Sequence, residues 1–184
     1  MSSAIMAWDE LNIIREDAVA YFKQKRKREE VDHFCDYLEF VLCLIYVYGW
    51  QDAEEVVGIV PMKDGLDDKT VNLDIKGETF RERIHKQAAD GTIADILRII
   101  DTEAHRDYNT GVYDAAKTSG KRVFKQWNTM RDDRVRETHD YLESTKVGID
   151  DRFYTYDGDS ALFPGGFELP ENNVNCRCWV TLSN

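Results

Sequence analysis

The stretch from Thr92 to Lys117, TIADILRIIDTEAHRDYNTGVYDAAK, constrains the fold of this chain more than any other. Apolar side chains recur in it at the three- and four-residue spacing of one helix face, and Thr92 can cap the first turn. The apolar stripe consists of Ile93, Ile96, Leu97, Ile100, Ala104, Tyr108 and Val112. The pattern predicts one long amphipathic helix. Its polar residues between Asp101 and Asn109 are expected to pack on a smaller module.

Further helices are predicted before this one. In the first fifty residues, helical spacing is followed by two apolar sets, Ile5, Trp8, Ala18 and Phe22, and then Phe34, Leu38, Val41, Leu42 and Ile45. We expect Gly49-Trp50 to end the second helix, because glycine suits the left-handed position after a helix. Another helix is predicted from about Glu78 to Ala89, closed by Gly91.

Beyond Lys121 the pattern changes to short strands and turns. KRVFKQWNT predicts a strand, DDRVRETHDYLES a short helix capped by Asp132 or Asp133, and CRCWVTL a final strand. The predicted fold class is therefore α+β, a helical N-terminal region followed by a small mixed α+β C-terminal module. We place the domain boundary near Pro61, with a helical region over 1–60 and a second domain over 61–184. That second domain would hold long helices over 78–117 and the compact module over 121–184.

Charge and apolar content exclude several classes of protein. The chain has 35 acidic against 24 basic residues, a net charge of −11, and both of its halves are acidic. We therefore expect weak or no direct DNA binding, since duplex binding needs a broad positive face. The basic run from Lys23 to Arg28 is followed by Glu29-Glu30 and predicts a solvated helix face. The most apolar stretch, Phe40 to Tyr48, is nine residues long. A membrane-spanning helix needs about 20. No secretory leader is evident, so we expect the four cysteines to be reduced thiols in a cytoplasm.

The segment QWNTMRDDRVRETH, residues 126–139, gathers the densest set of candidate functional side chains. Arg134, Arg136 and His139 could grip a phosphate, which would indicate a phosphate- or nucleotide-directed enzyme. Alternatively, the mixture of acids and arginines forms a network that holds a turn-rich module together, since guanidinium groups bond carboxylates and backbone carbonyls. The balance of both signs within seven residues favours the network.

The tetrapeptide Asn175-Cys176-Arg177-Cys178 places two thiols on one side of the last strand. Together with His139 they would supply three ligands to a metal, which is an incomplete structural zinc set. We therefore expect buried thiols, no metal and no cofactor, and keep His139, Cys176 and Cys178 as the alternative metal site.

In their order, these motifs resemble the phage head morphogenesis, or minor head, proteins similar to phage Mu F. The resemblance covers roughly Gly77 to Trp179. Its marks also include Leu142, Phe153 and the Phe163-Pro164-Gly165 turn. The motif residues are Trp127, Thr129, Asp132, Arg134, Arg136, His139, Pro164, Gly165, Asn175, Cys176, Arg177 and Cys178.

The resemblance implies a non-enzymatic virion protein of the head of a tailed phage or prophage. Such a protein would be made in the bacterial host cytoplasm and would act in head assembly, DNA packaging or ejection. Its expected partner is the portal protein, with capsid or scaffold protein as further partners, and no membrane. The motif residues would then be structural, bonding within the module, and residues 1–60 would dock on the portal or the capsid.

Overall fold

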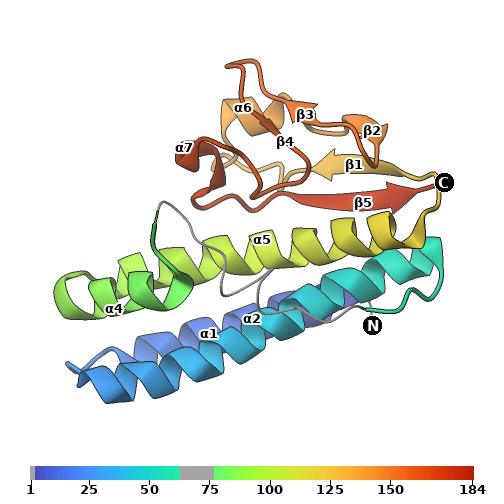
Figure 1. Ribbon diagram of the computed structural model, residues 1–184. Helices are drawn as coiled ribbons and strands as arrows, with labels where there is room; N and C mark the ends of the chain where they lie inside the picture. Colours follow the sequence, from blue (N-terminus) through green and yellow to red (C-terminus); the bar gives the residue numbers. More distant parts are fainter. Residues whose placement is uncertain (1–2, 63–76) are drawn as a thin grey trace.

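The computed structural model describes residues 3–62 and 77–184, which form two layers (Figure 1). The first layer is helical and contains α1 (Ser3–Tyr21), α2 (Arg28–Val57), α4 (Phe80–Asp90) and α5 (Ile93–Ser119). The second is a module of short elements: β1 (Phe124–Asn128), α6 (Glu137–Asp140), β2 (Lys146–Gly148), β3 (Phe153–Tyr154), β4 (Ser160–Ala161), α7 (Pro170–Asn173) and β5 (Trp179–Ser183). The predicted α+β class is confirmed.

Within the helical layer, α5 is the helix that faces the module, and it contacts both the other helices and β5. It starts as the sequence predicted, with the Thr92 side chain accepting a hydrogen bond from the backbone N–H of Asp95 and the Asp95 carboxylate accepting one from that of Thr92. This reciprocal pair satisfies two of the donors that a helix start leaves open. The apolar stripe of α5 is buried mainly against α2, with further contacts to α1 and α4.

Two glycines allow the backbones of α2 and α5 to touch. A Cβ placed at Gly49 would lie 2.9 Å from the carbonyl carbon of Tyr108, and one at Gly111 would lie 2.9 Å from the backbone nitrogen of Trp50. No other residue type fits such an approach without moving a helix. The prediction that α2 ends at Gly49-Trp50 is wrong, because Gly49 serves this crossing and the helix continues to Val57.

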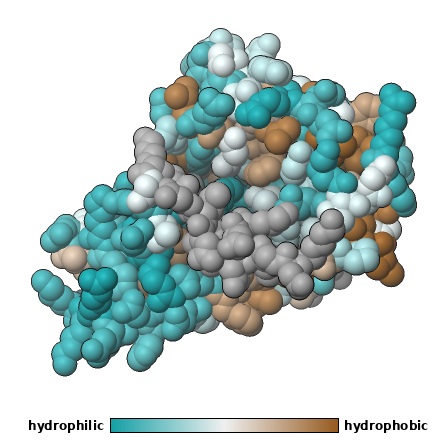
Figure 2. All heavy atoms as spheres, viewed as in Figure 1, coloured by the Kyte–Doolittle hydropathy of each residue, from teal (hydrophilic) through white to brown (hydrophobic). Residues whose placement is uncertain are grey.

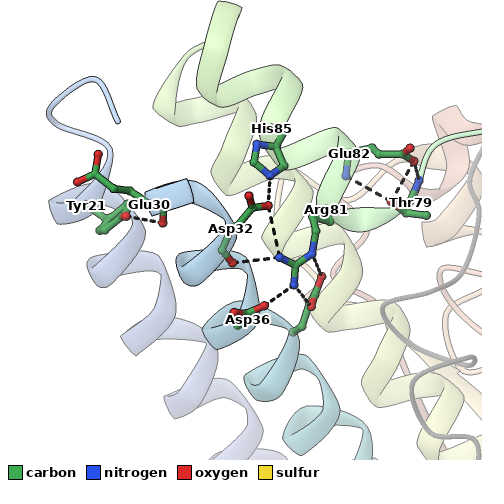
Figure 3. Close-up of polar contacts among 9 residues, drawn as sticks. Tyr21, Glu30, Asp32, Asp36, Thr79, Arg81, Glu82 and His85 are labelled. Atoms are coloured by element: carbon green, nitrogen blue, oxygen red, sulfur yellow. Dashed lines mark hydrogen bonds and ion pairs between the residues drawn. The ribbon is translucent and has the colours of Figure 1, made fainter. Parts of the chain in front are cut away.

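The short helix α4 is tied to the start of α2 by one arginine (Figure 3). The Arg81 guanidinium donates to both carboxylate oxygens of Glu39, to the Asp36 carboxylate at 2.6 Å and to the Asp32 carbonyl at 3.1 Å. His85 lies 2.6 Å from the Asp32 carboxylate, and this hydrogen bond lowers the pKa of Asp32. The predicted helix over 78–89 is confirmed, with Thr79 as its cap and Gly91 after its end.

The basic run does not lie on a helix face. Residues 22–27 form the turn between α1 and α2. In this turn the Arg26 guanidinium donates to the Tyr21 carbonyl and stacks over the Tyr21 ring. In Figure 2 the end of the molecule that carries this turn and the α4–α5 turn is mostly hydrophilic. No helix among the described residues is both long and apolar enough to cross a membrane.

The module contains a three-stranded antiparallel sheet in the order β2-β1-β5 and a two-stranded ribbon of β3 and β4. In the central strand, Trp127 pairs with Val180 and Lys125 with Leu182. Trp127 is fully buried and packs edge-on against Phe153 and His139. The alternation of buried and exposed side chains along β1 follows the two-residue period that predicted this strand.

Candidate functional site

His139, Cys176 and Cys178 form a buried cluster at the centre of the module. The Nδ1 atom of His139 lies 3.6 Å from the sulfur of Cys176 and 3.5 Å from the sulfur of Cys178. All three ligand atoms lie within 4.8 Å of one another, and each of the three residues is at most 4% exposed. The structure thus brings together the three residues that the sequence analysis kept as the alternative metal site.

Aromatic rings fix the orientation of the His139 imidazole. The ring stacks on Phe167 at 5.3 Å between centroids and meets the edge of Trp127 at 5.5 Å. Its second nitrogen, Nε2, is buried without a hydrogen-bond partner among the described residues. Packing, rather than a polar acceptor, therefore aims Nδ1 at the two thiols.

The segment that carries the two cysteines is held by hydrogen bonds from other elements. The Asn109 side chain, on α5, donates to the Cys178 carbonyl at 3.1 Å and accepts from the Val180 N–H at 2.9 Å. The Arg136 guanidinium donates to the carbonyl of Val174, just before the cysteines. Asn175 sits in the left-handed region at φ 58°, and its N–H donates to Thr102 of α5. The protein's own hydrogen bonds thus fix the positions of the two thiols.

The predicted packing of the polar side of α5 on the module is confirmed by Asn109. That this one amide would join α5 to both Cys178 and β5 was not predicted. Its place among the polar residues from Asp101 to Asn109 of this amphipathic helix was the available signal.

The contacts within the cluster shift the pKa values of the two thiols in opposite directions. The pKa of Cys176 is held below its ordinary value because the Cys178 thiol donates a hydrogen bond to its sulfur and the His139 ring lies beside it. The pKa of Cys178 is raised correspondingly, by that bond and by burial.

Most of the arginines predicted to hold turns bond inside the module. Arg177 makes a bidentate pair with Asp132 at 2.9 and 2.7 Å, which lowers the pKa of Asp132. Arg131 bonds Glu143 through two nitrogens, and Glu143 also accepts from the N–H of Thr129 at 2.6 Å. The side chains of Arg131 and Arg134 are both largely exposed, at 72% and 73%, and Arg134 makes a longer contact, 3.3 Å to Asp132.

The predicted short helix from Asp132 is wrong in its extent. Residues 132–135 form a turn, and α6 contains only Glu137–Asp140. Asp132 therefore bonds Arg177 instead of lying one helical turn before Arg136. Asp132 pairs with Arg177 because a bidentate guanidinium–carboxylate contact is strong. The charge pattern of residues 126–139 alone does not reveal this distant partner.

Pro164 and Gly165 lie away from the thiol cluster, against α5. Gly165 has a φ of 90°, and a Cβ there would lie 3.0 Å from the Cα of Arg106. Beneath this turn Arg106 pairs with Glu103 at 2.6 Å and with Asp107 at 3.0 Å, and burial raises the pKa of Asp107 to about 7. The Phe-Pro-Gly turn therefore packs directly on the buried ion pairs that Arg106 makes with Glu103 and Asp107.

Two adjoining cavities border the cluster. The larger, about 640 Å³, lies between α1, α5 and the module, and its lining includes Arg15, Asp101, His105, Arg134, Arg136 and Cys176. The smaller, about 10 Å³, is lined by His139, Cys176 and Cys178 and shares Met130 and the arginines with the larger. Arg134, Arg136 and His139 all line the smaller cavity, which has room for about one water molecule and is too small for a phosphate group. Arg134 and Arg136 also line the larger cavity, but His139 is not part of its lining.

The fold and site define a compact α+β module, mounted on long helices and centred on a buried His-Cys-Cys cluster. Residues 68–181, more than half of the chain, match the sequence model of the family described as Phage Mu protein F like protein. The chain belongs to this family.

Two relatives show where similar segments occur. Over 108 residues the chain is 32% identical to NAD(+)–arginine ADP-ribosyltransferase EFV of Enterococcus faecalis, covering 56% of this chain and 22% of that protein. Over 99 residues it is 28% identical to minor head protein GP7 of Bacillus phage SPP1, covering 53% of this chain and 32% of that protein. The matches thus span less than a third of either relative. No solved structure matches the chain.

Proposed function

We propose that this protein is a minor structural component of a phage head and that it acts by binding other head proteins. Membership of the Phage Mu F-like family carries the proposal, together with the similarity to a minor head protein of Bacillus phage SPP1. The bonds that Arg136 and Arg177 make within the module support it further, because they give these groups a structural role.

The portal protein is the partner we propose first, with capsid or scaffold protein as further partners. The helices outside the module offer surface for such contacts. Ile13 on α1 and Phe40 on α2 are 50% and 62% exposed, and Ile59 just after α2 is 94% exposed. Burial of such large apolar side chains by a partner removes their surface from water and therefore favours binding. The net charge of −11 disfavours direct contact with packaged DNA.

The proposed location follows from the proposed function. The protein would be made in the cytoplasm of the bacterial host and incorporated into the phage head, where it would assist assembly, packaging or ejection.

An enzymatic function is the second candidate, favoured by one observation. The 640 Å³ cavity is large enough for a small ligand and is lined by several guanidinium groups. One relative is also named as an arginine ADP-ribosyltransferase, although the match covers only 22% of it. This candidate predicts transfer of ADP-ribose from NAD⁺ to an arginine acceptor, with loss of transfer in an Arg136→Ala variant.

Particles purified from an induced host test the first proposal. Mass spectrometry should find the protein in intact heads, in far fewer copies than the major capsid protein, and affinity capture with the full chain should recover the portal protein. A double variant, Ile13→Ser with Phe40→Ser, should weaken capture, whereas Gln51→Ala on the exposed side of α2 should not. Absence from purified heads, together with transfer activity that Arg136→Ala removes, would favour the enzyme.

A further inference from the structure

We propose that His139, Cys176 and Cys178 bind one zinc ion, through the Nδ1 atom of the histidine and the two sulfurs. The distances from Nδ1 to the sulfurs of Cys176 and Cys178 are 3.6 and 3.5 Å. A tetrahedral zinc with Zn–S bonds of about 2.3 Å and a Zn–N bond of about 2.1 Å separates nitrogen from sulfur by about 3.6 Å. Both nitrogen–sulfur distances therefore match those of a tetrahedral zinc site, and the three atoms all lie within 4.8 Å of one another.

Hydrogen bonding alone accounts for this geometry less well. A neutral imidazole nitrogen that accepts has one lone pair in the ring plane, so it is suited to one S–H donor. Here two sulfurs lie at nearly equal distances from the same nitrogen. A single ion bound by all three atoms explains the equal spacing.

Charge and burial also fit a divalent ion. Two thiolates and a neutral imidazole would balance the charge of Zn²⁺, so the bound cluster would be neutral at a place where an unpaired charge is costly. Thiolate and imidazole are ligands that zinc prefers over harder cations. The bonds from Asn109, Arg136 and Thr102 hold the cysteine segment in place, which lowers the entropic cost of binding.

Three protein ligands leave a fourth position for an exchangeable ligand. Among residues 3–62 and 77–184, no fourth His, Cys or carboxylate joins the cluster. The cavity of about 10 Å³ beside the three side chains has room for one water molecule. Arg136 and Arg177 also line this cavity, so the fourth ligand would be water or a small anion.

The wild-type full chain provides the deciding measurement. Purified under reducing conditions from cells grown with zinc, it should contain about one zinc per chain, removable by a strong chelator and restored by added zinc. Replacement by Co²⁺ should give the absorption of a tetrahedral cobalt thiolate, including sulfur-to-metal charge transfer. A folded wild-type protein that retains no zinc and gives no cobalt–thiolate absorption would overturn the proposal.

Matched variants assign the ligands. Cys178→Ser and His139→Ala should lose most of the bound zinc, and His139→Cys should retain it by offering a third thiolate. The controls Cys43→Ser and His33→Ala remove the same residue types elsewhere and should keep the wild-type zinc content. Zinc content unchanged in folded Cys178→Ser and His139→Ala proteins would place the metal elsewhere and contradict the assignment. If these two variants fail to fold, the wild-type zinc content and cobalt spectrum still decide whether a zinc–thiolate site exists.

Discussion

The helical layer and the C-terminal module are stable for different reasons. The helices are long, carry continuous apolar stripes and bury them against one another, with α2 and α5 in backbone contact at Gly49 and Gly111. The strands of the module contain two to five residues, and its turns are fixed by side chains that bond backbone groups. Short elements bury little area each, so the module depends on specific polar bonds and on a few large core residues.

The largest effect should come from the centre of the module. Trp127→Ala removes a fully buried indole that contacts His139 and Phe153, and should lower the free energy of unfolding by about 4 kcal/mol. Denaturant unfolding followed by circular dichroism measures it. If the two layers are separately stable, helix content should survive while the module signal is lost. Retention of near-wild-type stability would show that the module is not organised around Trp127.

In the helical layer the corresponding change is Gly49→Ala. The new methyl group would meet the backbone of Tyr108, so α2 and α5 must separate, and we expect a loss of about 3 kcal/mol. Gln51→Ala, on an exposed position of the same helix, is the matched control and should change stability little. An equal, small effect in both variants would show that the close backbone contact at Gly49 does not determine how α2 packs on α5.

The joint between the layers is tested at Asn109. Asn109→Ala leaves the Cys178 carbonyl and the Val180 N–H without their buried partner, which should cost about 2 kcal/mol. Hydrogen exchange should show faster exchange of the Val180 amide, with the amides at the start of α5 unaffected. Thr110→Ala, one residue further along the same helix, serves as control because Thr110 bonds only the Arg106 carbonyl of its own helix.

The smallest effect concerns Lys125, a buried cation of the module. Its ammonium group donates to the Ile149 carbonyl at 2.7 Å, and burial lowers its pKa to about 8. The unfolded chain therefore binds more protons than the folded one between pH 8 and about 10, so stability should rise with pH across that window, by about 1–2 kcal/mol. In Lys125→Met this rise should disappear. An identical pH dependence in both proteins would show that Lys125 is not the titrating group.

Sequence patterns predicted the two layers to different extents, for the same physical reason that they differ in stability. Regular periodicity identified α5 and its Thr92 cap, as well as β1, because burial of one face leaves a local signature. The end of α2 was misplaced because a glycine that permits close packing looks like a glycine that ends a helix. Asp132 was predicted only as a candidate helix cap, because its bidentate contact with Arg177 spans 45 residues and leaves no local pattern. The motif order indicated the family, and ligand chemistry grouped His139 with Cys176 and Cys178, but only the fold shows that the three side chains meet.

The contact between α2 and α5 also has a mechanical consequence. Most helix pairs are separated by interlocking side chains that can change rotamer and let one helix slide past the other. At Gly49 and Gly111 the backbones of the two helices touch directly, so we expect α2 and α5 to move as one rigid body. A displacement of α2 would then also shift α5 and the module that packs on it.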